Sequence, residues 1–303
     1  MPDKRVSDMA YSKLMLGTVQ FGLQYGINNS IGKPSLENVK AILRAAADGG
    51  INVLDTARNY GDSEEVLGIA LQETGLDKHF KIISKVKLFP ENLAPEQVRD
   101  WITESVTTIL RYLKRDTLDG LLLHNEKDLP YFDELTIALE KMWTLAVGAS
   151  LDSVDGSPDK YTAHLSMAQV PGNILDRRFF KTAQAIKSRN GSVFVRSVYL
   201  QGLLFKSTEA AGEKFAPVMA VRDKLVKLAD AAGITPAELY FRYLLSQDFI
   251  DCILTGVDSV EQLKENISVA EKGALPDDLL SEIEKTVPVL PEKYIRPAVW
   301  NSF

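Results

Sequence analysis

Four polar residues lie at or just past the ends of strand-like runs, where they could act together on a substrate. Asp55 ends the run 52–55, Lys85 follows the run 81–84, and His124 follows the run 120–123. Tyr60 lies in the segment after Asp55. In a parallel barrel the carboxyl ends of the strands share one face, so residues distant in sequence can meet there. Taken singly, each residue has a structural explanation, such as a helix cap, but their positions at successive strand ends predict one site.

These residue types fit proton donation to a carbonyl group. A phenol has a pKa of about 10, a lysine ammonium beside it lowers that pKa, and a carboxylate holds the ammonium charged and in place. Tyr60 is therefore the expected general acid, with Lys85 and Asp55 as the groups that tune it. His124 is expected to donate a hydrogen bond to the carbonyl oxygen, where negative charge builds. None of the four supplies the attacking group, so a hydride donor must be bound.

Short aliphatic runs alternate with longer amphipathic stretches along the chain, which predicts βα units on a parallel sheet. Strands are expected at 14–18, 51–55, 80–86, 118–124, 144–150, 166–171, 192–198 and 252–256. Helical patterns between them cover 36–48, 63–73, 95–113, 132–142, 178–189 and 217–232. Eight such units close most economically as a single (β/α)8 TIM barrel.

Extra helices are expected after strands 7 and 8. A helix between these strands begins at Thr235 and Pro236, which suit an N-cap and a first helical turn. Two more helical patterns, 259–272 and 276–287, follow the last strand. No linker or low-complexity tract marks a boundary, so residues 1–303 are expected to form one domain. The tail carries Tyr294, Trp300 and Phe303, which either dock on the surface or wall a substrate pocket.

The composition predicts a protein that acts on a small molecule. The net charge is −6 and no basic stripe offsets it, so the surface repels nucleic acid and anionic membranes. No run reaches the roughly 18 apolar residues of a membrane span, and the N-terminus lacks the apolar core of a signal peptide. The single cysteine, Cys252, lies in an apolar run that predicts a buried strand position. These features predict a cytoplasmic protein, and the spacing of the three histidines predicts no metal site.

A phosphate site is expected where the eighth strand ends. Thr255 and Gly256 close that strand, and Asp258 and Ser259 lead directly into a helix. A glycine turn before a helix N-terminus suits a phosphate group, and barrel enzymes often bind phosphate after strands 7 and 8. The first strand is not followed by a Gly-x-Gly-x-x-Gly motif, which argues against a Rossmann domain.

From about Leu14 to Asn266, these motifs resemble the aldo-keto reductases. The matching segments are 54–57 with 60–61, then 84–86, then 123–124, in the family's order. The resemblance implies a (β/α)8 barrel that binds NADP(H) or NAD(H) in extended form and reduces an aldehyde or ketone. It assigns Tyr60 as general acid, Lys85 and Asp55 as its tuning groups, and His124 as the group that orients the carbonyl.

The resemblance also implies a set of cofactor contacts. They are Gly17, Thr18, Asp55, Ser150, Gln169, Asn173, Arg196, Ser197, Gln201, Gly202, Gly256, Asp258, Gln262, Glu265 and Asn266. Leu151 stands where many members have Asn, which leaves the nicotinamide carboxamide to Ser150 and Gln169. Arg196 stands where many members stack an aromatic ring on the nicotinamide, and its planar guanidinium can stack instead.

The residues after the eighth strand bear on the choice between NADP(H) and NAD(H). Many NADPH-selective members have a small hydroxyl residue followed by Arg, whereas this chain has Asp258 followed by Ser259. A carboxylate at 258 repels a 2'-phosphate and suits a ribose hydroxyl, which favours NADH or use of both cofactors. Lys206 and Lys264 can restore phosphate binding, so both cofactors stay open.

The expected partner is a small carbonyl compound, and segments 16–26 and 196–204 resemble bacterial members of surface-sugar pathways, which indicates a sugar-derived substrate. One alternative is a regulatory barrel that binds nicotinamide cofactor with little turnover, like the potassium-channel β-subunits of this family. Another is a lyase in which Lys85 forms a Schiff base with the substrate. The natural substrate, its stereochemistry and the oligomeric state stay open.

Overall fold

Eight parallel strands in chain order form a closed barrel, in which β1 pairs with both β2 and β8. The structure, a computed structural model, describes residues 9–24, 32–153 and 163–302. The strands are β1 (Leu14–Gly17), β2 (Val53–Asp55), β3 (Lys81–Lys85), β4 (Gly120–Leu123), β5 (Val147–Ser150), β6 (Met167–Pro171), β7 (Ser192–Arg196) and β8 (Cys252–Gly256). Each lies within the range expected from the sequence, so the predicted (β/α)8 barrel is confirmed.

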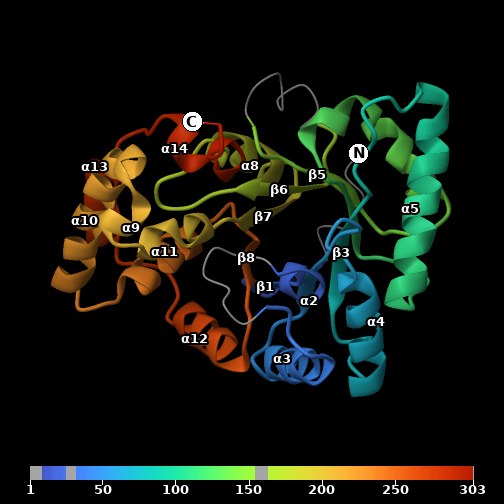
Figure 1. Ribbon diagram of the computed structural model, residues 1–303, viewed down its shortest axis with the longest axis horizontal. Coiled ribbons are helices and arrows are strands. Elements are labelled where there is room, and N and C mark those ends of the chain that lie inside the picture. The colour runs from blue at the N-terminus through green and yellow to red at the C-terminus, as the bar shows by residue number, and fades with distance from the viewer. Residues whose placement is uncertain (1–8, 25–31, 154–162, 303) are drawn as a thin grey trace.

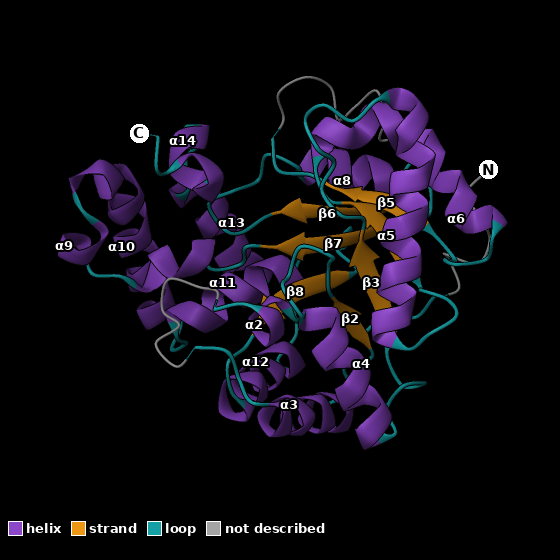
Figure 2. Ribbon diagram, turned by 45° about the vertical axis from the view of Figure 1, so that its right-hand side comes forward, coloured by secondary structure: helices purple, strands orange, loops and turns teal. Residues whose placement is uncertain are grey.

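Helices surround the strands, as Figures 1 and 2 show. Those up to β7 are α2 (Val19–Gly22), α3 (Leu36–Asp48), α4 (Ser63–Thr74), α5 (Val98–Leu113), α6 (Thr136–Glu140) and α8 (Phe180–Lys187), with 3-10 turns η1 (Pro95–Gln97) and η2 (Glu126–Leu135). Between β7 and β8 lie η3 (Leu200–Phe205), α9 (Thr208–Ala211), η4 (Glu213–Phe215), α10 (Ala216–Ala231) and α11 (Pro236–Leu245). After β8 come α12 (Val260–Glu271), α13 (Asp277–Thr286), α14 (Glu292–Ile295) and η5 (Pro297–Val299). The extra helices expected after strands 7 and 8 are therefore present.

Local sequence signals set where several helices begin. Three helices follow an N-cap residue whose side chain accepts a hydrogen bond from a backbone N–H of the first turn. The N-caps are Ser35 for α3, Thr235 for α11 and Ser259 for α12. Such N-caps satisfy donors that have no partner within the helix. The helical pattern expected at 132–142 is instead the end of η2, a 3-10 helix that contains Pro130, followed by the short α6.

The interior of the barrel explains how the strands direct side chains into a site. A buried apolar layer inside it consists of Met15, Val53, Ile83, Leu122, Ala146, Met167, Phe194 and Cys252. Alternate residues of a strand face the same side. Two positions further along β2, β3, β6 and β7, the residues facing this interior are Asp55, Lys85, Gln169 and Arg196. A polar layer thus lies directly on the apolar one, at the carboxyl ends of the strands.

Two predictions about single residues have clear outcomes. Cys252 is fully buried in β8, as expected, and burial raises the pKa of its thiol. In the tail, the ring of Trp300 packs edge-on against Phe215 with centroids 4.9 Å apart, and its indole N–H donates to the Tyr294 carbonyl oxygen. This packing favours surface docking of the tail over a role in a pocket. Phe303 and residues 25–26 of the segment 16–26 lie outside the described residues.

Two kinds of feature are absent from the described residues. No helix there has the length and apolar character needed to cross a membrane. In the same part of the chain, no cluster of three or more His, Cys, Asp or Glu side chains has an arrangement that could hold a metal ion.

Candidate active site

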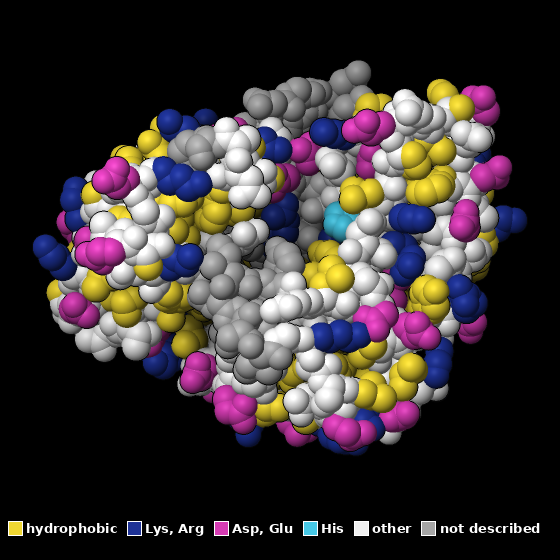
Figure 3. Space-filling view, viewed as in Figure 1, with side chains coloured by type: hydrophobic (Ala, Val, Ile, Leu, Met, Phe, Trp, Pro, Cys, Tyr) yellow, Lys and Arg dark blue, Asp and Glu magenta, His cyan; other side chains and the backbone are white. Residues whose placement is uncertain are grey.

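A cavity of about 660 Å³ opens at the carboxyl ends of the strands. Figure 3 shows a hollow in one face of the molecule, with Lys or Arg atoms inside it and a histidine at its rim. The cavity volume falls within the roughly 300–1,000 Å³ of small-molecule sites. The predicted site residues that line it are Gly17, Asp55, Tyr60, His124, Ser150, Gln169, Arg196, Ser197, Gln201, Gly202, Gly256, Asp258 and Gln262.

Lys85 lies buried beneath Tyr60, with its ammonium group fully hydrogen-bonded. Its Nζ donates to Asp55 Oδ1 at 2.5 Å, to the Thr56 carbonyl oxygen at 3.1 Å and to the Tyr60 hydroxyl at 3.1 Å. An ammonium has three N–H groups, so each one has an acceptor. Because the Tyr60 oxygen accepts from Lys85, the hydroxyl hydrogen is left to point toward the cavity.

The charges in this group favour an ammonium and a protonated phenol. Burial alone would lower the pKa of Lys85, but Asp55 and Tyr60 outweigh burial and raise it above its ordinary value. For Tyr60, Lys85 lowers the pKa as expected, but the net shift has the opposite direction. Burial raises its pKa by more than Lys85 lowers it, so the net pKa lies above 10. At neutral pH Tyr60 is therefore protonated, which is the form that a proton donor needs.

His124 lies next to Tyr60 in an edge-to-face contact, with ring centroids 5.8 Å apart and planes at 84°. Burial, together with the nearby positive charges of Lys85 and Arg196, lowers the pKa of His124 to about 3. Its Nδ1 is buried and has no hydrogen-bond partner among the described residues. A neutral imidazole carries one N–H donor and one acceptor. His124 can therefore donate a hydrogen bond to a ligand without carrying a charge.

Two glycines allow the Tyr60 loop to pack against α2. A Cβ atom at Gly22 would lie 1.8 Å from the Tyr60 carbonyl oxygen. Gly61 has a positive φ of 61°, and a Cβ atom there would lie 2.4 Å from the Gly22 carbonyl oxygen. Positive φ and close backbone approach both favour glycine. The sequence pair Tyr60-Gly61 thus reflects a backbone requirement as well as a chemical one.

Thr18 does not line the cavity, but it fixes the backbone at Asp55. Its backbone N–H and its hydroxyl both donate to the Asp55 carbonyl oxygen, at 3.0 and 2.9 Å. Its hydroxyl also lies 2.8 Å from Ser63 Oγ, the first residue of α4. Thr18 therefore holds the ends of β1 and β2 together, a role that the resemblance did not imply.

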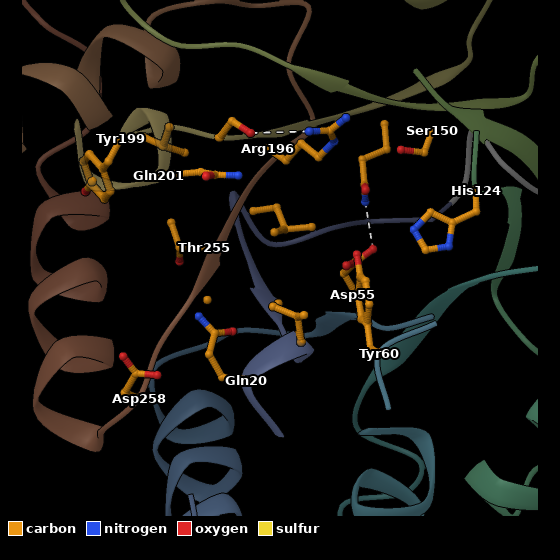
Figure 4. Close-up of a pocket in the computed structure, with 18 of the residues that line it drawn as sticks. Gln20, Asp55, Tyr60, His124, Ser150, Arg196, Tyr199, Gln201, Thr255 and Asp258 are labelled. Atoms are coloured by element: carbon orange, nitrogen blue, oxygen red, sulfur yellow. Dashed lines mark hydrogen bonds between the residues drawn. The ribbon is translucent and has the colours of Figure 1, made fainter. Parts of the chain in front are cut away.

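Two polar side chains, one from β6 and one from β7, are fixed by hydrogen bonds in the cavity wall, and Figure 4 labels the second of them, Arg196. Gln169 Nε2 donates to Asp55 Oδ1 at 2.7 Å, which ties the amide to the Lys85–Asp55 pair. Arg196 donates to the Leu151 carbonyl oxygen at 2.9 Å and to Asp152 Oδ1 at 3.0 Å. Both groups are thus held in place before any ligand binds.

Asp152 connects Arg196 to the C-terminal segment. Its other carboxylate oxygen accepts from Arg296 Nε at 2.7 Å, and Arg296 also pairs with Glu292. Burial would raise the pKa of Asp152, but the two arginines outweigh it and lower the pKa. The segment around α14 therefore helps to fix a residue that lines the cavity.

The backbone after β7 adopts a left-handed conformation at several residues. Ser197, Leu200 and Gln201 have φ values of 67°, 49° and 53°. Left-handed backbone costs roughly 1–3 kcal/mol at a residue other than glycine, and such strain clusters at functional sites. Ser197 and Gln201 both line the cavity. The strain therefore coincides with the strand end where a cofactor is expected.

The far end of the cavity is formed where β8 meets α12. The Asp258 backbone N–H donates to Gln262 Oε1 at 2.9 Å, and burial raises the pKa of the Asp258 carboxyl group. Among the residues described there, Glu265 and Asn266 do not line the cavity, although Asn266 Nδ2 lies 3.5 Å from Thr255 Oγ1. Asn173 likewise lies outside the lining and donates to the Ser197 carbonyl oxygen.

Several residues that line the cavity were not predicted from the sequence. They are Val19, Gln20, Leu88, Asn125, Val198, Tyr199, Phe205 and Leu254. Two of them could have been predicted from their neighbours, because Gln20 closely follows Gly17 and Thr18, and Asn125 follows His124. The rim residues Leu88 and Phe205, about 40% and 46% exposed, could not, because only the folded loops bring them to the mouth.

The closed barrel carries this group of polar side chains at the carboxyl ends of its strands, where barrel enzymes have their active sites. The model of the Aldo/keto reductase family matches residues 13–288, and the chain belongs to that family. "NADH-specific methylglyoxal reductase" of Escherichia coli is 25% identical, over 86% of this chain and 90% of that protein. "Probable voltage-gated potassium channel subunit beta" of Arabidopsis thaliana is 24% identical, over 95% and 98%.

A solved structure agrees with the fold. The holo form of aldo-keto reductase AKR11C1 from Bacillus halodurans superposes with a TM-score of 0.76, covering 95% of this chain and 96% of that one. The two sequences are 23% identical, so the likeness concerns the barrel itself.

Proposed function

We propose that this protein is an NAD(P)H-dependent reductase of aldehydes or ketones, acting as one barrel domain, with Tyr60 as the general acid. One observation carries the proposal: Lys85 donates to the Tyr60 hydroxyl at 3.1 Å from a buried site in which all its N–H groups are bonded. Hydride transfer to the carbonyl carbon is the chemistry that a reduced nicotinamide supplies when bound. The chain then has to provide the proton and the oxygen-binding groups.

The residues divide this work between them. Tyr60 donates its proton to the carbonyl oxygen, and the Lys85 ammonium stabilises the phenolate that is left. Asp55 keeps Lys85 charged and in position. His124, held neutral by burial and by Lys85 and Arg196, gives the same oxygen a second hydrogen bond. Two preorganised donors thus meet the negative charge of the transition state.

The cavity fits an extended dinucleotide. Ser150, Gln169 and Arg196 would hold the nicotinamide end, beside the catalytic group. Ser197, Gln201 and Gly202 line the middle, and Gly256, Asp258 and Gln262 line the other end. His124 Nδ1 and Gln20 Oε1 are buried and have no hydrogen-bond partner among the described residues, as expected of a polar site that binds a ligand. The residues that would support these walls without lining the cavity are Thr18, Asn173, Glu265 and Asn266.

We propose NADH as the preferred cofactor. Asp258 lines the far end of the cavity, whereas Lys206 and Lys264 are absent from the described lining. A carboxylate there favours a ribose hydroxyl over a 2'-phosphate. The similarity to an Escherichia coli protein named as NADH-specific supports the same choice.

The first test is a fluorescence titration of the purified protein with NADH and, separately, with NADPH. Saturable binding, tighter for NADH, is expected; binding of neither nucleotide would defeat the proposal. A screen of aldehydes, ketones and sugar-derived carbonyl compounds then follows with wild type and Tyr60→Phe. The variant should bind cofactor as wild type does and lose about 10²–10⁴-fold in turnover, and normal turnover by it would refute the role of Tyr60.

A second candidate function is a regulatory barrel that binds cofactor with little turnover. It is favoured by the likeness to a protein named as a potassium channel subunit, which covers 95% of this chain. Very slow cofactor release and a stable complex with a second protein would support it. A Schiff-base lyase is disfavoured, because the Lys85 nitrogen is a charged ammonium with all three N–H groups bonded and no lone pair to attack a carbonyl.

A further inference from the structure

Gln20 is a polar side chain in the cavity wall that neither the family signatures nor the proposed mechanism uses. It lies in the short helix α2, directly after β1, and is 8% exposed. It lines the cavity, yet its Oε1 is buried and receives no hydrogen bond from the described residues. An unsatisfied buried acceptor costs about 1–3 kcal/mol.

The Gln20 amide lies flat against the end of β8. A Cβ atom built at Gly256 would lie 2.4 Å from both Oε1 and Nε2 of Gln20. Gly256 has an ordinary backbone conformation, since it is absent from the glycines of positive φ. The reason for a glycine here is therefore space, and the side chain that occupies this space is Gln20.

Figure 4 shows Gln20 extending into the cavity, with Asp258 and Thr255 to one side of it and Tyr60 to the other. Gln20 thus lies between the catalytic end and the far end. An extended dinucleotide has sugar hydroxyls between its two rings, and a hydroxyl is the kind of donor that an amide oxygen lacks here.

We infer that Gln20 is a further cofactor-holding residue, whose amide oxygen accepts a hydrogen bond from a sugar hydroxyl of the bound dinucleotide. A side chain at Gly256 would have to displace the Gln20 amide from this position. This inference rests on the proposed nicotinamide binding. It explains why an unsatisfied acceptor is kept in the wall of the cavity, where a ligand can satisfy it.

The test compares Gln20→Met with wild type in two measurements. Methionine keeps the length of the side chain and removes the acceptor. The Kd for NADH, measured by fluorescence titration, should rise about fivefold, as expected for the loss of one hydrogen bond. The free energy of unfolding of the cofactor-free protein, measured in urea, should stay the same or rise, because an unsatisfied buried group is removed. Gln72→Met, the same change at an exposed position of α4, should alter neither quantity.

Gly256→Ala provides a second perturbation of the same contact. The added methyl group should displace the amide and weaken NADH binding, and its effect should be smaller in the Gln20→Met background than in wild type. Unchanged NADH binding by Gln20→Met, or weaker binding together with lower stability, would overturn the inference. If wild type itself binds neither nucleotide, the proposed function fails and the inference fails with it.

Discussion

Replacing His124 with glutamine should make the protein less sensitive to acid. The folded protein holds His124 neutral, with a pKa of about 3, because the ring is buried and lies near Lys85 and Arg196. The pKa of a histidine in the unfolded chain is about 6.5. Between these two values the unfolded chain binds a proton that the folded protein does not. The neutral ring therefore costs no stability above pH 6.5, and stability falls as the pH drops from 6.5 toward 3.

The two pKa values set the size of this effect. Each pH unit below 6.5 lowers the free energy of unfolding by about 1.4 kcal/mol, which integrates to about 2 kcal/mol between pH 7 and pH 5. Some carboxyl groups act in the opposite direction, since burial raises the pKa of Asp128 to about 6 and also raises that of Glu64. Their contribution is common to wild type and His124→Gln, so the difference between the two proteins isolates the histidine.

The assay is urea unfolding of both proteins at pH 7, 6 and 5 and constant ionic strength. The stability difference between wild type and His124→Gln should move by about 2 kcal/mol in favour of the variant from pH 7 to pH 5. His79→Gln controls for the loss of a histidine that hydrogen-bonds the Ile51 carbonyl oxygen instead. Parallel stability curves for wild type and His124→Gln would show that His124 titrates normally, and the neutral-donor role would then have no basis.

Three further predictions follow from the same contacts. Lys85→Met should lower the free energy of unfolding by about 3–5 kcal/mol because it leaves the buried Asp55 carboxylate without its ion pair. Lys85→Met combined with Asp55→Asn should lower it by less than the single change. Urea unfolding of both variants checks this. Asp258→Ser should shift the ratio of the NADPH and NADH dissociation constants about tenfold toward NADPH, a change of about 1.4 kcal/mol, and an unchanged ratio would contradict the role of the carboxylate. Asp152→Asn should loosen Arg196, lowering the free energy of unfolding by about 1–2 kcal/mol and raising the Kd for NADH; if only stability changes, Asp152 does not act through the cavity.

Much of the proposed catalytic group was predictable because a strand imposes a period of two residues. Asp55, Lys85 and His124 each lie two positions after an apolar residue of the inner layer, namely Val53, Ile83 and Leu122. A strand that buries the first residue inside the barrel must direct the second to the same interior. Hydrophobic pattern and strand order therefore sufficed to bring these side chains together.

The remaining features depend on contacts that strand periodicity does not determine. The direction of the Tyr60 pKa shift follows from how deeply the loop buries the phenol, and that depth depends on the close approach of Gly22 and Gly61. The position of Gln20 follows from its contact with Gly256, near the other end of the chain. The lining of the mouth by Leu88 and Phe205 depends on loop conformation in the same way. Sequence patterns predicted which strands meet, but not how their loops pack.

Inside the barrel, the apolar layer serves stability and the polar layer serves the proposed chemistry. The two layers lie only two residues apart along a strand. On β3, Ile83 belongs to the apolar layer and has no polar group to satisfy, whereas Lys85 is kept charged in a buried position by Asp55, Thr56 and Tyr60. A change at Ile83 alters packing, and its effect should appear in the free energy of unfolding. The unsatisfied Gln20 Oε1 and His124 Nδ1, the left-handed backbone after β7 and the shifted pKa of His124 all lie in the upper layer or beyond it. The unsatisfied atoms and the left-handed backbone lower the stability of the ligand-free protein. A ligand that satisfies these two atoms would offset part of that cost.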